Sequence, residues 1–246
     1  RYVSEFFDAF PYQALTSGAK DVHPDRLVDH SLPALKQWAD REDAMLAELE
    51  RINFPSLAAR PERGTYLFLQ NQLESAQAFR ACRMELWNVS PTWTGWQAEM
   101  PVIAGMQTTS TPTDQVNAVA RFSQLPKYLD DEIANLKEGL RLKYTAPKHN
   151  VETVIGQMDA LLKAPVAESP FVQMAKKDAP GFRKQLEELE KTQIRPAIQR
   201  YRDFLHDVYV KEAREAIGVS ANPDGGACYE ASVKYYATVT MTPKEV

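Results

Sequence analysis

Apolar residues recur along most of the chain at intervals of three and four, which places them on one face of an α-helix. The clearest pattern covers residues 32–53 and follows Ser31, a residue suited to cap a first turn. A second long helix is predicted over 62–88, after a connection bracketed by Pro55 and Pro61. Because this helix is apolar on more than one side, we expect it to be central and packed by several neighbours.

Four further helical segments follow in the second half. One begins at Thr113–Gln115 and is interrupted by Pro126, and the next carries Leu129, Ile133, Leu136 and Leu140 in register. Asn150 is expected to cap another. The last, a charged helix, starts near Pro180, is kinked or broken at Pro196, and ends just before Gly218.

Three stretches lack a clear helical period. Residues 90–111 are rich in Pro, Thr and Trp and are predicted to form a structured loop. Residues 222–226 have the composition of a turn, and residues 235–240 have the composition of a short strand. The pattern as a whole predicts an all-α fold: an irregular multi-helix bundle with long antiparallel helices, Pro-kinked helices and little or no sheet.

The length of 246 residues fits a single helical region over 1–246, or two sub-units over 1–111 and 112–246. The hydrophobic content of 44% is that of a globular protein, and the net charge is -4. No Lys/Arg-rich run occurs, so nucleic acid is not an expected partner. No apolar run approaches the ~20 residues of a membrane-spanning helix, so no transmembrane segment is predicted.

The two cysteines, Cys82 and Cys228, lie far apart in the sequence. A disulfide between them is one interpretation. Because cysteine is common inside protein cores, two buried free thiols are the favoured one.

Residues that would carry catalysis are not apparent. The four histidines lack the pair four residues apart, with an adjacent Glu, that a common zinc peptidase uses. Asp203 and His206 share a helix face, but a metal site needs further ligands. Gly-rich phosphate loops and Gly-x-Ser-x-Gly elbows are also missing. We therefore predict no catalytic residue, no metal site and no cofactor in this chain.

An aromatic cluster is the best candidate for a binding surface. It comprises Trp87, Trp93 and Trp96, whose large apolar rings carry a polar tip suited to a ligand groove. Packing in the core is the favoured alternative for these three side chains. Arg83 and Tyr235 complete the candidate set for a substrate cleft.

A charged pair is predicted inside the first helical hairpin. Glu42 falls within the apolar face of the helix over 32–53, and Arg80 within the apolar face of the helix over 62–88. A charge in an apolar stripe is rarely tolerated without a partner. If the two helices are antiparallel, Arg80 lies about one turn from the level of Glu42, so we expect a Glu42–Arg80 ion pair.

The last residues have the pattern of a helix start. Thr242, Pro243 and Glu245 match a capping box with proline at the first helical position. A helix start with no helix behind it favours a chain that continues in a longer protein.

Several segments together resemble a bacterial family catalogued as domain of unknown function 885. The densest match is Arg83-Met84-Glu85-Leu86-Trp87-Asn88-Val89-Ser90 followed by Gly95-Trp96-Gln97. Other matching segments lie in 17–31, 122–140 and 223–246, so the resemblance spans nearly the whole chain. One departure is visible at 238–240, where Val239 separates two threonines that we expect to be adjacent.

The resemblance implies more than the residues themselves do. Members are about twice this length, and their second half resembles a gluzincin zinc peptidase. It implies that this chain is the helical N-terminal part, that zinc belongs to the parent protein, and that the missing C-terminal half is the natural partner. Export and lipoprotein signals among members imply a periplasmic or cell-surface setting.

Two functions are compatible with these observations. The first is a non-catalytic helical region that forms part of the substrate cleft of a zinc-peptidase-like protein, with a peptide as substrate. The alternative is a free-standing helical binding or scaffold module with no enzymatic descent.

Overall fold

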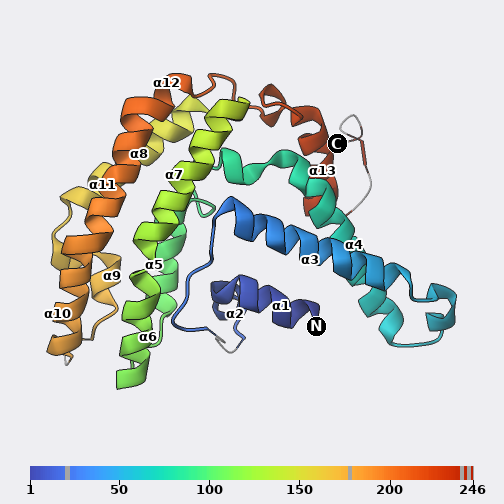
Figure 1. Ribbon diagram of the computed structural model, residues 1–246, viewed down its shortest axis with the longest axis horizontal. Helices are drawn as coiled ribbons and strands as arrows, with labels where there is room; N and C mark the ends of the chain where they lie inside the picture. The colour runs from blue at the N-terminus through green and yellow to red at the C-terminus, as the bar shows by residue number, and fades with distance from the viewer. Residues whose placement is uncertain (20–22, 177–178, 239–240, 243–244, 246) are drawn as a thin grey trace.

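The computed structural model describes residues 1–19, 23–176, 179–238, 241–242 and 245 (Figure 1). The described chain is all-α, as predicted; its residues form no named strand, and one isolated bridge joins Pro147 to Arg214. The α-helices are α1 (Tyr2–Ala9), α2 (Pro11–Thr16), α3 (Leu32–Glu50), α4 (Glu62–Phe79), α5 (Trp96–Met106), α6 (Pro112–Phe122), α7 (Leu125–Leu142), α8 (Lys148–Lys163), α9 (Pro170–Gln173), α10 (Pro180–Leu189), α11 (Arg195–Phe204), α12 (Val210–Glu212) and α13 (Gly225–Ala237).

Short turns of other helix types link these elements. The 3₁₀ turns are η1 (Phe54–Leu57), η2 (Arg80–Cys82), η3 (Met84–Leu86), η4 (Val166–Glu168) and η7 (Val219–Ala221), and the π segments are η5 (Glu190–Ile194) and η6 (Leu205–Tyr209). None of the helices in the described part of the chain is long and apolar enough to cross a membrane.

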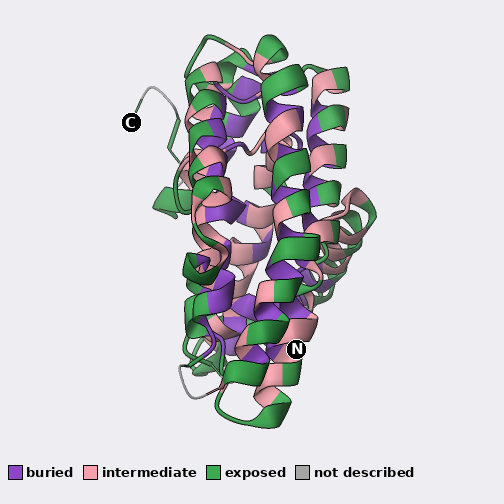
Figure 2. Cartoon of the chain, turned by 90° about the vertical axis from the view of Figure 1, so that its left-hand side faces the viewer, coloured by how far each residue is buried: buried purple, intermediate pink, exposed green. Residues whose placement is uncertain are grey.

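The helices fall into an upright bundle and a projecting hairpin (Figure 1). Helices α5 to α11 stand in the bundle, where α11 packs between α7 and α8. Helices α3 and α4 form the antiparallel hairpin, with α1 and α2 near α3 and with α13 packed on α4 and η2. Buried residues face inward between the bundle helices (Figure 2).

Two hydrophobic clusters hold these parts together. The larger fills the bundle and includes Met100, Phe122, Leu129 and Tyr201. It draws residues from both sides of position 111. The smaller lies in the hairpin, where Met45, Leu46, Leu49, Leu57, Tyr66 and Leu73 pack together.

Several helix starts follow the sequence closely. Ser31 caps α3, with its hydroxyl oxygen accepting from the Ala34 amide at 3.4 Å. Thr111 and Asp114 form a reciprocal capping box at the start of α6, with distances of 3.1 and 2.9 Å. Helix α7 begins at Leu125, next to Pro126, so the predicted interruption is confirmed.

The predicted helix over 62–88 is wrong in its last two turns. Helix α4 ends at Phe79, and the chain continues through η2 and η3. Between these turns Arg83 has a φ of 46°, a left-handed conformation that breaks the helical path. Amphipathic spacing persists through this segment, and for that reason periodicity alone did not locate the break.

The predicted loop over 90–111 is also wrong, because α5 occupies Trp96–Met106. Pro101 lies inside this helix, where it removes one backbone hydrogen bond. Met100, Ile103 and Ala104 of the same helix are almost completely buried. Burial of this face outweighs the local cost of the proline, since most helix stability in proteins comes from tertiary packing.

Two predicted boundaries near residues 147 and 217 shift for one shared reason. Helix α8 begins at Lys148 rather than after Asn150, and α12 ends at Glu212 rather than at Ile217 before Gly218. Backbone hydrogen bonds join Lys148 N to Arg214 O at 2.8 Å and Arg214 N to Ala146 O at 3.1 Å. This bridge needs extended backbone in both segments. Helix α12 therefore ends at Glu212, and α8 begins directly after Pro147.

Pro196 does not break the charged helix. It follows the π segment η5, whose wider turn accommodates the missing amide donor, and helical structure continues through α11 and η6. The strand-like composition at Tyr235–Ala237 is misleading, because these residues belong to α13. Residues 239 and 240 lie outside the described part.

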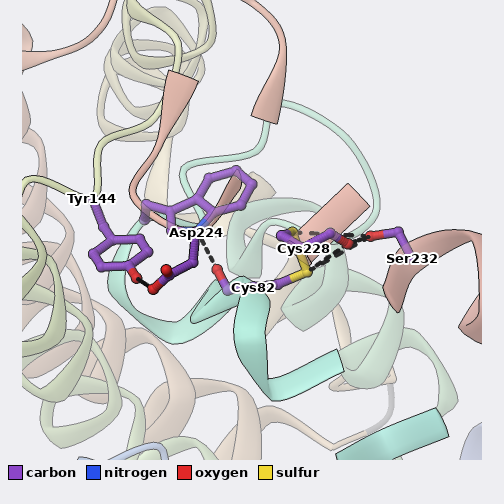
Figure 3. The surroundings of a disulfide bond; sticks show 6 residues. Cys82, Tyr144, Asp224, Cys228 and Ser232 are labelled. Carbon is purple, nitrogen blue, oxygen red and sulfur yellow. Dashed lines mark hydrogen bonds between the residues drawn. A yellow bond between two sulfur atoms is a disulfide. The ribbon is translucent and has the colours of Figure 1, made fainter. Parts of the chain in front are cut away.

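The expectation of two free thiols is wrong. Cys82, at the end of η2, and Cys228, in α13, form a disulfide that joins segments 146 residues apart (Figure 3). Both residues are buried. Ser232 Oγ donates to Cys228 O at 2.8 Å, and Tyr144 Oη donates to Asp224 at 2.9 Å at the start of α13. The sequence spacing carried no signal for this pairing.

At the chain end, part of the predicted capping box is visible. The Thr242 amide donates to the Glu245 carboxylate at 2.7 Å. Pro243 and Lys244 lie outside the described residues.

Candidate substrate cleft

A cleft of about 710 Å³ lies between α3, the end of α1 and the segment that follows α4. Its volume is within the range of protein sites that bind small molecules or peptide side chains. The apolar lining residues are Phe10, Leu32, Leu35, Trp38, Ala39, Phe79 and Met84, and the polar ones are His30, Lys36, Glu42, Arg80, Arg83, Glu85 and Asn88. The cleft thus combines apolar walls with a band of charges.

The backbone at Arg83 is fixed by its neighbours. The φ of 46° costs roughly 1–3 kcal/mol for a residue other than glycine and requires support from the surrounding structure. That support comes from the η2 and η3 turns on either side and from the adjacent Cys82 disulfide. Helix α7 packs so closely against η3 that a side chain at Gly139 would overlap the Leu86 carbonyl.

The Arg83 side chain lies at the cleft with much of its hydrogen-bonding capacity unused. Its Nε atom donates to Glu85 Oε1 at 3.1 Å, and its side chain is 42% exposed. Among the described residues, no hydrogen bond is made by its two terminal nitrogens. A guanidinium in this state can donate to a carbonyl or carboxylate oxygen of a ligand.

Arg80, in contrast, uses both terminal nitrogens of its guanidinium within the hairpin. Its Nη1 donates to both carboxylate oxygens of Asp43, at 2.8 and 2.9 Å. Its Nη2 donates to Glu42 Oε2 and to the Ala39 carbonyl, each at 3.0 Å. The structure therefore contains the Glu42–Arg80 pair expected from the helix faces, and adds Asp43 as a second partner.

Glu42 is the more buried member of that pair, with a side chain only 9% exposed. Burial raises the pKa of its carboxyl group, while the hydrogen bond and charge of Arg80 act in the opposite direction. The pair is thus a structural element of the cleft wall rather than a free binding group.

A buried polar cluster adjoins the cleft through the lining residue His30. His30 contacts the Glu132 carboxylate through Nδ1 and stacks on Tyr128, with ring centres 5.3 Å apart. Burial lowers the pKa of His30, but the charge and hydrogen bond of Glu132, together with the charges of Glu99 and Asp131, shift the pKa upward overall. Burial raises the pKa of the nearby Glu99 carboxyl, which is hydrogen-bonded by Tyr12. This cluster joins α2, α5 and α7 to the segment before α3.

The other aromatic candidates are not brought together. Trp96 is buried against Tyr201, with ring centres 5.5 Å apart, whereas Trp93 is 77% exposed. Trp87 donates from Nε1 to Cys82 O at 2.8 Å, and the Arg214 guanidinium lies 5.0 Å from its ring centre. Trp96 therefore lies in the core and Trp93 on the surface, whereas Trp87 packs against the turn that contains Cys82.

Tyr235 stands behind the cleft rather than in it. Its ring stacks on Phe79, a lining residue, with centres 4.6 Å apart. Sequence patterns missed the lining residues His30, Trp38 and Phe79. They come from three separate segments, and only the apolar face of α3 gave a partial signal for Trp38.

No metal site is formed by residues in the described ranges, where no three His, Cys, Asp or Glu side chains are placed to hold an ion. His206 is hydrogen-bonded to Asp207 at 2.7 Å, and Asp203 accepts from Gln199 at 2.7 Å. The Asp203/His206 spacing is thus occupied by ordinary surface contacts.

Fold and cleft together define an all-α region built from a helical bundle and a hairpin that encloses a mixed apolar and charged cleft. The chain belongs to the family described as "Bacterial protein of unknown function (DUF885)", whose model matches residues 11–246. No curated protein matches the chain.

A solved structure with the same fold is described as "the putative lipoprotein from Colwellia psychrerythraea". The two chains superpose with a TM-score of 0.79 at 16% sequence identity. The similarity covers 97% of this chain and 45% of that one, so this chain spans less than half of its structural relative.

Proposed function

We propose that this chain forms one wall of the substrate cleft in a peptidase-like protein of the bacterial cell envelope. The observation that carries the proposal is the cleft of about 710 Å³ with Arg83 at its charged band. The apolar side chains of an extended peptide can pack on walls such as Trp38 and Phe79. Its carbonyl oxygens can accept hydrogen bonds from the Arg83 guanidinium. The relative described as a lipoprotein supports the cell-envelope setting.

The bond-breaking groups are assigned to the rest of the protein. The described residues of this chain do not fit a zinc site. Because the structural relative is more than twice as long, we propose that the other half supplies the zinc ligands and closes the cleft. The role of this chain is then to bind the substrate and exclude water, which raises the rate through orientation.

Arg83→Gln in the full-length protein tests this role. We expect the KM for hydrolysed peptides to rise at least tenfold while kcat changes by less than about threefold, because the residue binds substrate without taking part in bond cleavage. Arg60→Gln, an exposed position outside the cleft lining, is the matched control and should leave both constants unchanged.

Two results would count against the proposal. Equal kinetics for the Arg83 and Arg60 variants would remove the cleft from substrate binding. A full-length protein that hydrolyses no member of a diverse peptide mixture, yet binds peptides, would favour the binding-module alternative.

A further inference from the structure

A second cavity, separate from the cleft, lies in the helical bundle. It has a volume of about 380 Å³ and is bounded by residues of α5, α8, α9 and α11 together with η5. Its apolar walls include Ala98, Leu161, Phe171 and Ile198. Its size and lining fit a compact ligand with an apolar body.

Glu190 is the unusual residue of this cavity. It is the first residue of the π segment η5, and its side chain is only 3% exposed. Oε1 lies 3.3 Å from Arg195 Nε, whereas Oε2 is buried and accepts no hydrogen bond from the described residues. A buried acceptor without a donor costs roughly 1–3 kcal/mol, and π segments occur often at functional sites.

The nearby cation does not satisfy this carboxylate completely. Both terminal nitrogens of Arg195 are turned to backbone carbonyls, Nη1 to Leu162 O at 2.9 Å and Nη2 to Ala164 O. Only Nε remains for Glu190. Burial raises the pKa of the Glu190 carboxyl, while Ser169 and Arg195 act in the opposite direction. These features are expected of a buried carboxyl group that does not receive hydrogen bonds at both of its oxygens.

The remaining polar lining adds acceptors and negative charge. Glu168 also lines the cavity, and its lining contains no Lys, Arg or His among the described residues. Gln97 Nε2 donates to Ser90 O at 2.6 Å and to Gln157 Oε1 at 2.8 Å, and Gln157 Nε2 donates to Pro91 O at 2.9 Å. The amide donors are therefore used within the protein, and the Ser169 hydroxyl, whose hydrogen bond lowers the pKa of Glu190, is a further donor in the lining. The cavity is acidic, and its lining offers few donors.

From this arrangement we propose that the cavity binds a primary ammonium group carried on a compact apolar body. The ammonium donates to Glu190 Oε2, and the body packs on the apolar walls. A free amine and a lysine side chain share this chemistry. The site is independent of the cleft and of peptide hydrolysis, because no described residue lines both cavities.

Calorimetric titration with benzylamine tests the proposal. We expect saturable one-to-one binding that weakens at least tenfold in Glu190→Gln and stays within twofold in Glu188→Gln, an exposed residue near the end of α10. Benzyl alcohol, which has the same shape without the charge, should bind at least tenfold more weakly. Ala160→Phe places a bulky ring at an exposed lining position and should abolish binding without altering Glu190.

A second arm distinguishes the source of the ammonium. Nα-acetyl-lysine N-methylamide that competes with benzylamine indicates a peptide-borne lysine, whereas benzylamine binding alone indicates a free amine. Absence of saturable benzylamine binding would overturn the proposal. Equal affinity in the wild type and Glu190→Gln would overturn it as well. If Glu190→Gln does not fold, Ala160→Phe takes its place, and unchanged benzylamine affinity in that variant would overturn the proposal.

Discussion

Replacing both Cys82 and Cys228 with alanine is expected to lower the free energy of unfolding by about 4–5 kcal/mol. The disulfide closes a loop of 146 residues, and chain-entropy models assign more stabilisation to a disulfide as the loop that it closes grows longer. The bond ties the turn before Arg83 to α13, so its loss also releases the backbone at the cleft. Urea unfolding of the oxidised protein and of the double variant measures the difference.

Ser232→Ala is the control for the surroundings of this bond. It removes one hydrogen bond to Cys228 O and should cost only about 1 kcal/mol. A double-alanine variant within about 1 kcal/mol of the wild type would show that the disulfide contributes little to the folded state. Reduction with dithiothreitol should reproduce the loss seen in the alanine variant.

Replacing Arg80 with methionine is expected to cost about 3 kcal/mol at neutral pH. The change leaves Glu42 buried without its cation, and breaking a pair from one side usually costs about 3–5 kcal/mol. Proton uptake by Glu42 limits the cost to the lower end. Glu42→Gln should cost about 1 kcal/mol or less, because Arg80 keeps Asp43 and the Ala39 carbonyl.

The pH dependence of this loss has a defined sign. The pKa of Glu42 is raised in the folded state, so its contribution to stability is fully present below its ordinary value of 4.5 and is lost as pH rises through the folded pKa. Without Arg80 the pKa should rise further. The cost of Arg80→Met should therefore grow from about pH 4 to about pH 7 in denaturant unfolding. Equal costs for Arg80→Met and Glu42→Gln would contradict the assignment.

Local patterns in the sequence identified the fold class and several helix starts. Ser31 sits at a real N-cap because capping depends on a few adjacent residues. The helix expected from Thr113–Gln115 begins one residue earlier, at Pro112, after the cap Thr111. The Glu42–Arg80 pair could be predicted from the sequence for a similar reason, because helix periodicity and a short connection determine which faces of a hairpin meet.

Features that depend on contacts between distant segments could not be predicted from local sequence patterns. Helix α5 contains Pro101 and forms because its other face is buried. The bridge between Lys148 and Arg214 moved two helix ends, and the pairing of Cys82 required α13 to lie against η2. The cleft itself combines residues from α3, the chain around α1 and the turns after α4, an arrangement that no single stretch of sequence encodes.

Photochemical crosslinking tests the cleft assignment most directly. A peptide substrate that carries p-benzoylphenylalanine is irradiated with the full-length protein, and the adducts are located by mass spectrometry of the digested protein. We expect adducts within 30–42 and 79–88, the segments that provide most of the cleft lining, and we expect these adducts to be lost in excess unlabelled peptide. Adducts that fall only outside residues 1–246, or around exposed Trp93 on the surface, would contradict it.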